Sequence, residues 1–177
     1  MIKIGILICP NSDMEALAIR QSLEYFGYEV YVKFIGRPND FRNFLQNKLF
    51  SESINFFILC FHGVGGGFVM PKLSNEIYAI NEVRNKFDNK NVEKYCSLNN
   101  KVIFSTACTV GEKNMADVFT KNNSIFIAPK GYIEGNSAYI FVISFLYNYL
   151  INEDLNKAFA IAHGIDRETR QFMFFSV

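Results

Sequence analysis

The chain has 177 residues, which fits one domain because domains usually contain about 100–200 residues. Lys and Arg total 18 against 17 Asp and Glu, and half of the residues are hydrophobic. The balanced charge gives no reason to expect nucleic acid or a membrane surface as a partner. The longest apolar run, residues 138–151, is shorter than the roughly 20 residues that cross a bilayer. We therefore expect a single soluble domain spanning residues 1–177.

The cysteines and the first residues bear on compartment and cofactors. Cys9, Cys60, Cys96 and Cys108 form no CxxC pair and no metal-ligand spacing, so we expect neither a metal nor another cofactor. The apolar stretch at 2–9 is too short for a signal peptide and lacks a small-residue cleavage site. It is better interpreted as a first strand of a cytoplasmic protein.

The first third of the chain alternates between strand and helix patterns. Residues 2–9 form a continuous apolar run, which is typical of a strand buried on both faces. Ser12 and Glu15 have the spacing of a capping box, and the helix that they open should end at Gly27. A strand at 28–34 and a helix from Pro38 to Leu49 follow.

The alternation continues to the C-terminus. The segment 54–63 is the most apolar strand, and a glycine-rich loop follows it. Helical periodicity then predicts a helix over 76–98, with an inner face of Ile80, Val83 and Phe87 and a break at 89–91. The remaining predicted elements are a strand ending near Cys108, a helix at 112–121, a strand at 124–129, and helices at 137–150 and 154–163. This order predicts an α/β domain with a mainly parallel sheet and helices on both faces.

Two reactive side chains stand at strand ends. His62 closes the third predicted strand and Cys108 closes the fourth. Sites in open α/β sheets form outside the carboxyl ends of the strands, so both side chains meet at one edge if these strands are neighbours. An imidazole beside a thiol favours the thiolate and delivers a proton to a leaving group. The backbone N–H groups of Gly63 and Cys108 are the natural donors to an oxyanion.

The other candidate residues have ordinary explanations. Cys60 lies inside an apolar strand, and Cys9 and Cys96 are interpreted as packing residues. His163 falls in the last turn of a helix, where a cation is favourable.

The segments "CFHG" at 60–63 and "TACTVG" at 106–111 resemble the His-Gly and Ala-Cys-x-x-Gly motifs of caspase-like (clan CD) cysteine peptidases. This clan includes caspases, metacaspases, clostripain, separase and the bacterial CHAT domains. The segment from Ser124 to Ala162 is similar to the end of CHAT domains, and the resemblance spans most of residues 1–163. It implies a three-layer sandwich in which a mainly parallel sheet is flanked by helices.

The resemblance also implies an activity, that of a cysteine endopeptidase acting on polypeptides through a thioacyl-enzyme. His62 is then the general acid/base, Cys108 the nucleophile, and Gly63 and Cys108 the oxyanion donors. The arginine with which caspases bind acidic substrates has no obvious counterpart, which leaves the specificity open.

Two alternatives remain open at this point. A class-I amidotransferase or DJ-1-like enzyme also carries its cysteine at a strand-to-helix turn, but its histidine follows the cysteine, so His163 would have to serve. A caspase-like module without activity would act as a scaffold or regulator, and it has no need of both His62 and Cys108.

Two further expectations concern the C-terminal half. By analogy with clan members that cleave after basic residues, Glu134 in the loop 129–138 is a candidate for binding a Lys or Arg side chain of the substrate. The alternative is that Glu134 caps the following helix. The apolar segment 171–177 should cover a sheet edge or pair as a terminal strand, and such an edge favours a homodimer.

Overall fold

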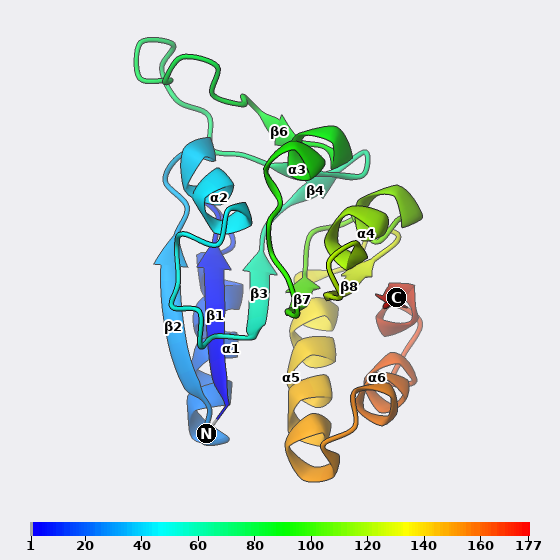
Figure 1. Ribbon diagram of the computed structural model, residues 1–177. Coiled ribbons are helices and arrows are strands. Elements are labelled where there is room, and N and C mark those ends of the chain that lie inside the picture. The colour runs from blue at the N-terminus through cyan, green and yellow to red at the C-terminus, as the bar shows by residue number, and fades with distance from the viewer. Residues whose placement is uncertain (1) are drawn as a thin grey trace.

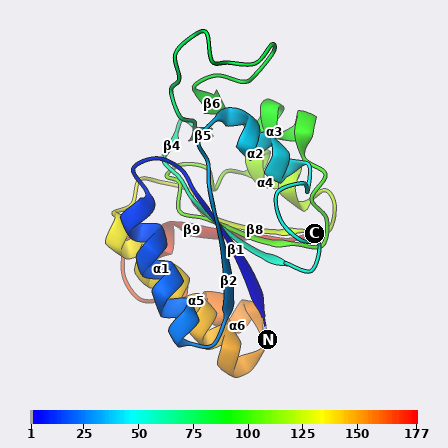
Figure 2. The same ribbon diagram turned by 90° about the vertical axis from the view of Figure 1, so that its left-hand side faces the viewer.

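The computed structural model describes residues 2–177 and contains a six-stranded sheet between two layers of helices (Figures 1 and 2). The strand order is β2-β1-β3-β7-β8-β9. Every neighbouring pair is parallel except β8 and β9, which are antiparallel. The predicted α/β class with a mainly parallel sheet is confirmed.

The elements have the following bounds. The large sheet contains β1 (Lys3–Ile8), β2 (Glu29–Phe34), β3 (Phe56–Cys60), β7 (Val102–Ser105), β8 (Ile125–Pro129) and β9 (Phe172–Phe175). A small antiparallel sheet contains β4 (Gly63–Val64), β5 (Gly67–Val69) and β6 (Lys86–Phe87). The helices are α1 (Asp13–Tyr25), α2 (Pro38–Leu45), α3 (Asn89–Tyr95), α4 (Lys113–Thr120), α5 (Gly135–Asn152) and α6 (Leu155–His163), and a 3-10 turn (Thr169–Gln171) precedes β9.

The core is divided by the sheet into two apolar layers. Helices α1, α5 and α6 cover one face, and α2, α3 and α4 cover the other (Figure 2). Neighbouring residues of the central strands point to opposite faces, so Ile58 and Phe104 pack with α5 while Phe57 and Ile103 pack on the other side. Both faces are buried, which explains why these strands are apolar at every position.

The connections place a crevice beside β1. From β1 the chain passes through α1 to β2 on one side, and then through α2 to β3 on the other side of β1. The order therefore reverses at β1, and ligands of open α/β sheets bind outside the carboxyl ends of the strands at such a point. The loops that follow β1, β3, β7 and β8 all reach this edge of the sheet.

The predicted helix over 76–98 is wrong. Residues 71–85 form an irregular loop that projects beyond α2, and the chain becomes helical only at α3 (Figure 1). Ile80, expected on an inner face, is 92 % exposed, whereas Phe87 is buried in β6. Asn81 and Asn85 adopt positive φ angles of 61°, which no helix accommodates.

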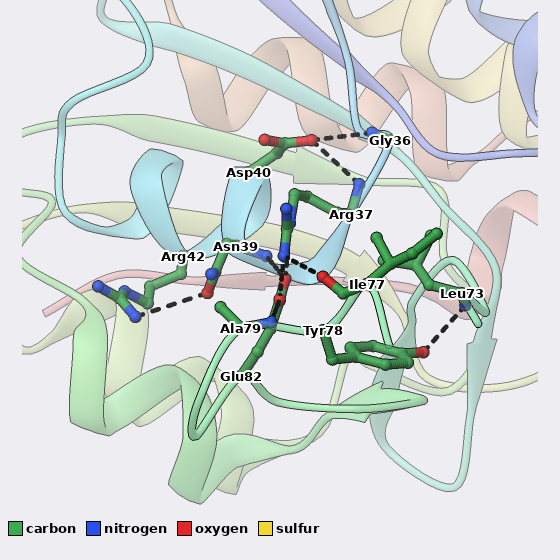
Figure 3. Close-up of polar contacts among 10 residues, drawn as sticks. All are labelled: Gly36, Arg37, Asn39, Asp40, Arg42, Leu73, Ile77, Tyr78, Ala79 and Glu82. Atoms are coloured by element: carbon green, nitrogen blue, oxygen red, sulfur yellow. Dashed lines mark hydrogen bonds and ion pairs between the residues drawn. The ribbon is translucent and has the colours of Figure 1, made fainter. Parts of the chain in front are cut away.

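A buried carboxylate holds this loop in place (Figure 3). Glu82 accepts hydrogen bonds from the Nε and Nη2 atoms of Arg37 and from the backbone N–H groups of Asn39 and Ala79. Arg37 also donates to the carbonyl of Ile77. The Arg37 guanidinium lowers the pKa of Glu82 to about 2. These long-range bonds, which the local sequence does not reveal, override the helical periodicity.

The C-terminal segment pairs as the last strand of the large sheet. Phe172 of β9 stacks on Phe141 of α5, with 3.7 Å between the ring centroids. The outer edge of β9 has no neighbouring strand in residues 2–177. Within the same residues, none of the helices has the length and apolar character needed to cross a membrane.

Candidate functional site

A cavity of about 280 Å³ opens at the carboxyl edge of the sheet. Its walls come from the segments that follow β1, β3, β7 and β8, which are consecutive strands in space. The lining residues are Asn11, Ser12, Met14, Glu15, Phe61, His62, Thr106, Cys108, Ile133, Gly135 and Ala138. A larger hollow of about 490 Å³ lies between α4 and β9, but neither a cysteine nor a histidine lines it. The smaller cavity is therefore the candidate site.

His62 reaches the cavity from the end of β3. The strand ends at Cys60, Phe61 is buried, and His62 is exposed at the edge. The His62 carbonyl accepts a hydrogen bond of 2.9 Å from the N–H of Val69 in the β4–β5 hairpin. The hairpin thus fixes the backbone from which the imidazole projects.

Cys108 reaches the same cavity from the end of β7. Strands β3 and β7 are parallel neighbours, with Leu59 opposite Ser105. The N–H of Thr106 continues this pairing with a bond of 3.0 Å to the Leu59 carbonyl. Cys108 is half-buried, and its thiol donates to the carbonyl of Ile133, with 3.6 Å between sulfur and oxygen. The expectation that His62 and Cys108 meet at one edge is confirmed, since both line this cavity.

Small residues around Cys108 are required by close backbone approaches. A Cβ atom on Gly63 would lie 2.0 Å from the Cys108 carbonyl oxygen, and one on Gly111 would lie 2.3 Å from that of Ala128. Thr109 adopts a φ of 65°, and its N–H donates to the Gly131 carbonyl at 3.1 Å. The turn that carries Cys108 is therefore packed against both neighbouring loops.

A carboxylate missed by the sequence analysis also lines the cavity. The capping box of Ser12 and Glu15 is not formed, because Ser12 makes no side-chain cap bond and Glu15 points to the sheet. Its Oε2 accepts a hydrogen bond of 3.2 Å from the hydroxyl of Thr106. Its Oε1 is buried and has no partner among residues 2–177. Burial raises the pKa of Glu15 to about 7.

The other candidate residues lie elsewhere. Glu134 is the exposed N-cap residue of α5 and does not line the cavity, although Ile133 and Gly135 do. Cys60 is buried in β3, where burial raises its pKa. His163 ends α6 and packs in a tilted arrangement against Phe159, with 5.1 Å between the ring centroids.

Similarity to known proteins is found in the structure and not in the sequence. Neither a family model nor a curated protein matches the sequence. Among solved structures, the chain is similar to a secreted C11 cysteine protease from Bacteroides thetaiotaomicron in complex with an irreversible peptide inhibitor. The TM-score is 0.52 at 11 % sequence identity, over 97 % of this chain and 63 % of that one. The fold is caspase-like. At this identity the similarity is evidence for the fold alone, and the chain spans less than two thirds of its neighbour.

The local sequence reveals two residues of the cavity, His62 and Cys108, but not the third, Glu15. His62 and Cys108 are recognisable because each follows an apolar strand and precedes small residues. Glu15 is not, because the spacing from Ser12 equally suits a helix cap and the deciding partner, Thr106, lies 91 residues away. Among residues 2–177, no group of three or more His, Cys, Asp or Glu side chains is arranged to hold a metal ion.

The contact between Gly63 and Cys108 generates a test of the site's packing. We expect Gly63→Ala to lower the free energy of unfolding by about 1–3 kcal/mol, because the new Cβ overlaps a backbone oxygen that cannot turn away. Urea denaturation measures the change. Gly36→Ala is the matched control, since its Cβ meets only a side-chain atom at 3.7 Å. Equal stability of the two variants would contradict this account.

Proposed function

We propose that the protein is a cysteine endopeptidase in which His62 and Cys108 act as a dyad. The observation that supports it is their convergence on one cavity, from parallel neighbouring strands of a caspase-like sheet. The fold neighbour is a protease captured with a peptide inhibitor, which is consistent with a polypeptide substrate. The motif resemblance includes CHAT domains, and we propose that residues 1–177 act as one peptidase domain.

The proposed reaction has two stages. The Cys108 thiolate attacks the scissile carbonyl carbon, and the backbone N–H groups of Gly63 and Cys108 bind the resulting oxyanion. When the C–N bond breaks, His62 gives its proton to the leaving amine and a thioester remains on Cys108. His62 then takes a proton from water, whose oxygen attacks the thioester carbon. The C–S bond breaks, the acid leaves, and the Cys108 thiolate and the protonated His62 are restored. No external oxidant or cofactor enters this sequence.

Two observations disfavour an amidotransferase or DJ-1-like enzyme. Such enzymes carry the nucleophile on a strained elbow that leads directly into a helix. Here the positive φ belongs to Thr109, and α4 begins five residues after Cys108, at Lys113. His163, the histidine that this reading requires, does not line the cavity. A scaffold without activity remains the second candidate, and the following test separates it from a peptidase.

Removing either member of the dyad should abolish peptide cleavage. We expect His62→Ala and Cys108→Ala each to lower kcat/KM by about 10³-fold or more, because residues that act as a unit are lost together. Fluorogenic peptides report the rates, and Cys60→Ser is the matched control at a cysteine outside the cavity. Full activity of Cys108→Ala would refute the mechanism, and absence of cleavage by the unmodified protein would favour the scaffold.

We further propose that the cavity accepts a basic side chain next to the scissile bond. Two carboxylates are candidates for binding its charge. Glu134 does not line the cavity, but its sequence neighbours Ile133 and Gly135 do. Glu15 lies in the cavity wall itself, with one oxygen unpaired in the described chain. A buried carboxylate gains most from a cation when it has no other charged partner, so we favour Glu15.

The substrate preference can be assigned with matched reporter peptides that end in Arg, Lys, Asp or Leu. Glu15→Gln should lower kcat/KM for Arg and Lys by about 10- to 100-fold and leave Leu unchanged. Glu134→Gln is the parallel variant, and it should have the smaller effect. Because the pKa of Glu15 is raised to about 7, the ratio of Arg to Leu cleavage should rise from pH 6 to pH 8 as the carboxyl ionises. The ratio cancels any effect of pH that is common to both substrates. Faster cleavage after Asp or Leu would overturn the proposal.

We propose a homodimer that forms through β9. Its outer edge has no neighbouring strand in the described chain, and such edges pair readily with a second copy. Met173, 36 % exposed, lies in the middle of this strand. We expect Met173→Lys to weaken self-association, whereas Ile151→Lys, at the exposed end of α5, should not. Sedimentation measures both, and a monomer at all concentrations of the unmodified protein would exclude the dimer.

We also propose a cytoplasmic location, with no nucleic-acid or membrane partner. All four cysteines are free, which is consistent with a reducing compartment. The net charge of +1 supports the absence of a polyanionic partner.

A further inference from the structure

The loop between β8 and α5, residues 130–134, contacts the Cys108 thiol. Ile133 from this loop lines the cavity, and its carbonyl accepts the hydrogen bond from the thiol. A displacement of the loop would therefore move one wall of the cavity and remove the partner of the sulfur at the same time.

The first half of the loop has two backbone anchors. The Gly131 carbonyl accepts a hydrogen bond of 3.1 Å from Thr109, the residue after Cys108. The N–H of Lys130 donates to the carbonyl of Gln171 at 2.8 Å. This half is thus attached to the Cys108 turn and to the segment that precedes β9.

The second half depends on a side chain from the C-terminal segment. Glu168 accepts a hydrogen bond of 2.7 Å from the backbone N–H of Glu134, the N-cap residue of α5. Glu134 makes no side-chain cap bond, so the carboxylate of Glu168 supplies the acceptor at this helix end, where negative charge is favourable.

Glu168 is itself held in a defined turn. Asp166 accepts hydrogen bonds from the N–H groups of Glu168, at 2.8 Å, and Thr169, at 2.7 Å. The bond from Thr169 is the main cause that lowers the pKa of Asp166. Thr169 is buried, Glu168 is half-buried and Glu134 is exposed, and neither glutamate belongs to an apolar layer. The turn is therefore fixed independently of the bond that it makes to the loop.

We propose that Glu168 is a positioning residue for the active site, holding the loop 130–134 so that Ile133 stays against Cys108. The inference rests on the proposed role of Cys108 as nucleophile. It extends the site to a carboxylate that does not line the cavity and that follows the last helix of the fold.

Two independent readouts test the proposal. Glu168→Ala should raise KM for a peptide substrate by about 5- to 20-fold while kcat changes little, because the wall that binds substrate loosens while the dyad stays. The same variant should speed alkylation of Cys108 by iodoacetamide about threefold or more, because the loop no longer holds the Ile133 carbonyl against the sulfur and the thiol becomes more accessible. General destabilisation would not raise KM selectively.

The controls keep the outcomes distinct. Glu168→Gln retains an oxygen acceptor and should restore KM and the alkylation rate to within about twofold. Asp154→Ala removes a carboxylate that caps α6 through Asn156 and Lys157, away from the cavity, and should change neither. Unchanged KM and alkylation in Glu168→Ala, or a Glu168→Gln variant as impaired as Glu168→Ala, would overturn the inference. If no peptide is cleaved at all, the peptidase assignment fails while the alkylation rates still report on the loop.

Discussion

The contact between the backbone of Gly63 and that of Cys108 is the constraint on which the candidate site depends. It exists because β3 and β7 are parallel neighbours and end at the same level, so the chain leaving one strand meets the chain leaving the other. Any side chain at position 63 would force the two segments apart. The segments that carry the His62 imidazole and the Cys108 thiol are therefore brought together where two neighbouring strands of the sheet end.

Glu15 places a buried carboxyl oxygen without a partner among residues 2–177 at the same edge of the sheet, an arrangement that stable cores avoid. A buried carboxyl oxygen without a partner is costly, and the pKa of about 7 reflects that cost. The local sequence offers a cheaper solution, a cap at the start of α1, which the structure does not adopt. Departures from local preference of this kind concentrate at functional sites, which is a reason to assign Glu15 to function rather than to packing.

Sequence reasoning succeeded where the pattern is local and failed where distant residues decide. The apolar runs of β1, β3 and β7 predict buried strands, and the positions of His62 and Cys108 follow from them. The sequence does not show that β3 and β7 are neighbours in the sheet, because a hairpin, a long loop and α3 separate them in the chain. Only the strand order of the structure shows it. The spacing of Ile80, Val83 and Phe87 suggests a helix, yet the bonds that Glu82 makes with α2 impose a loop.

The bonds of Glu82 have a consequence for how the loop 71–85 tolerates change. Four donors converge on one carboxylate, and two of them come from Arg37, so the shape of the loop depends on a few residues at its base. The exposed tip around Ile80 contributes no apolar burial. Unlike Val83 at the base of the loop, which packs against the core, this tip should accept substitutions and insertions with little effect on folding, because no core contact is lost there. The structure thus offers a position where sequence can diversify, or a foreign peptide be displayed, without disturbing the strands that carry His62 and Cys108.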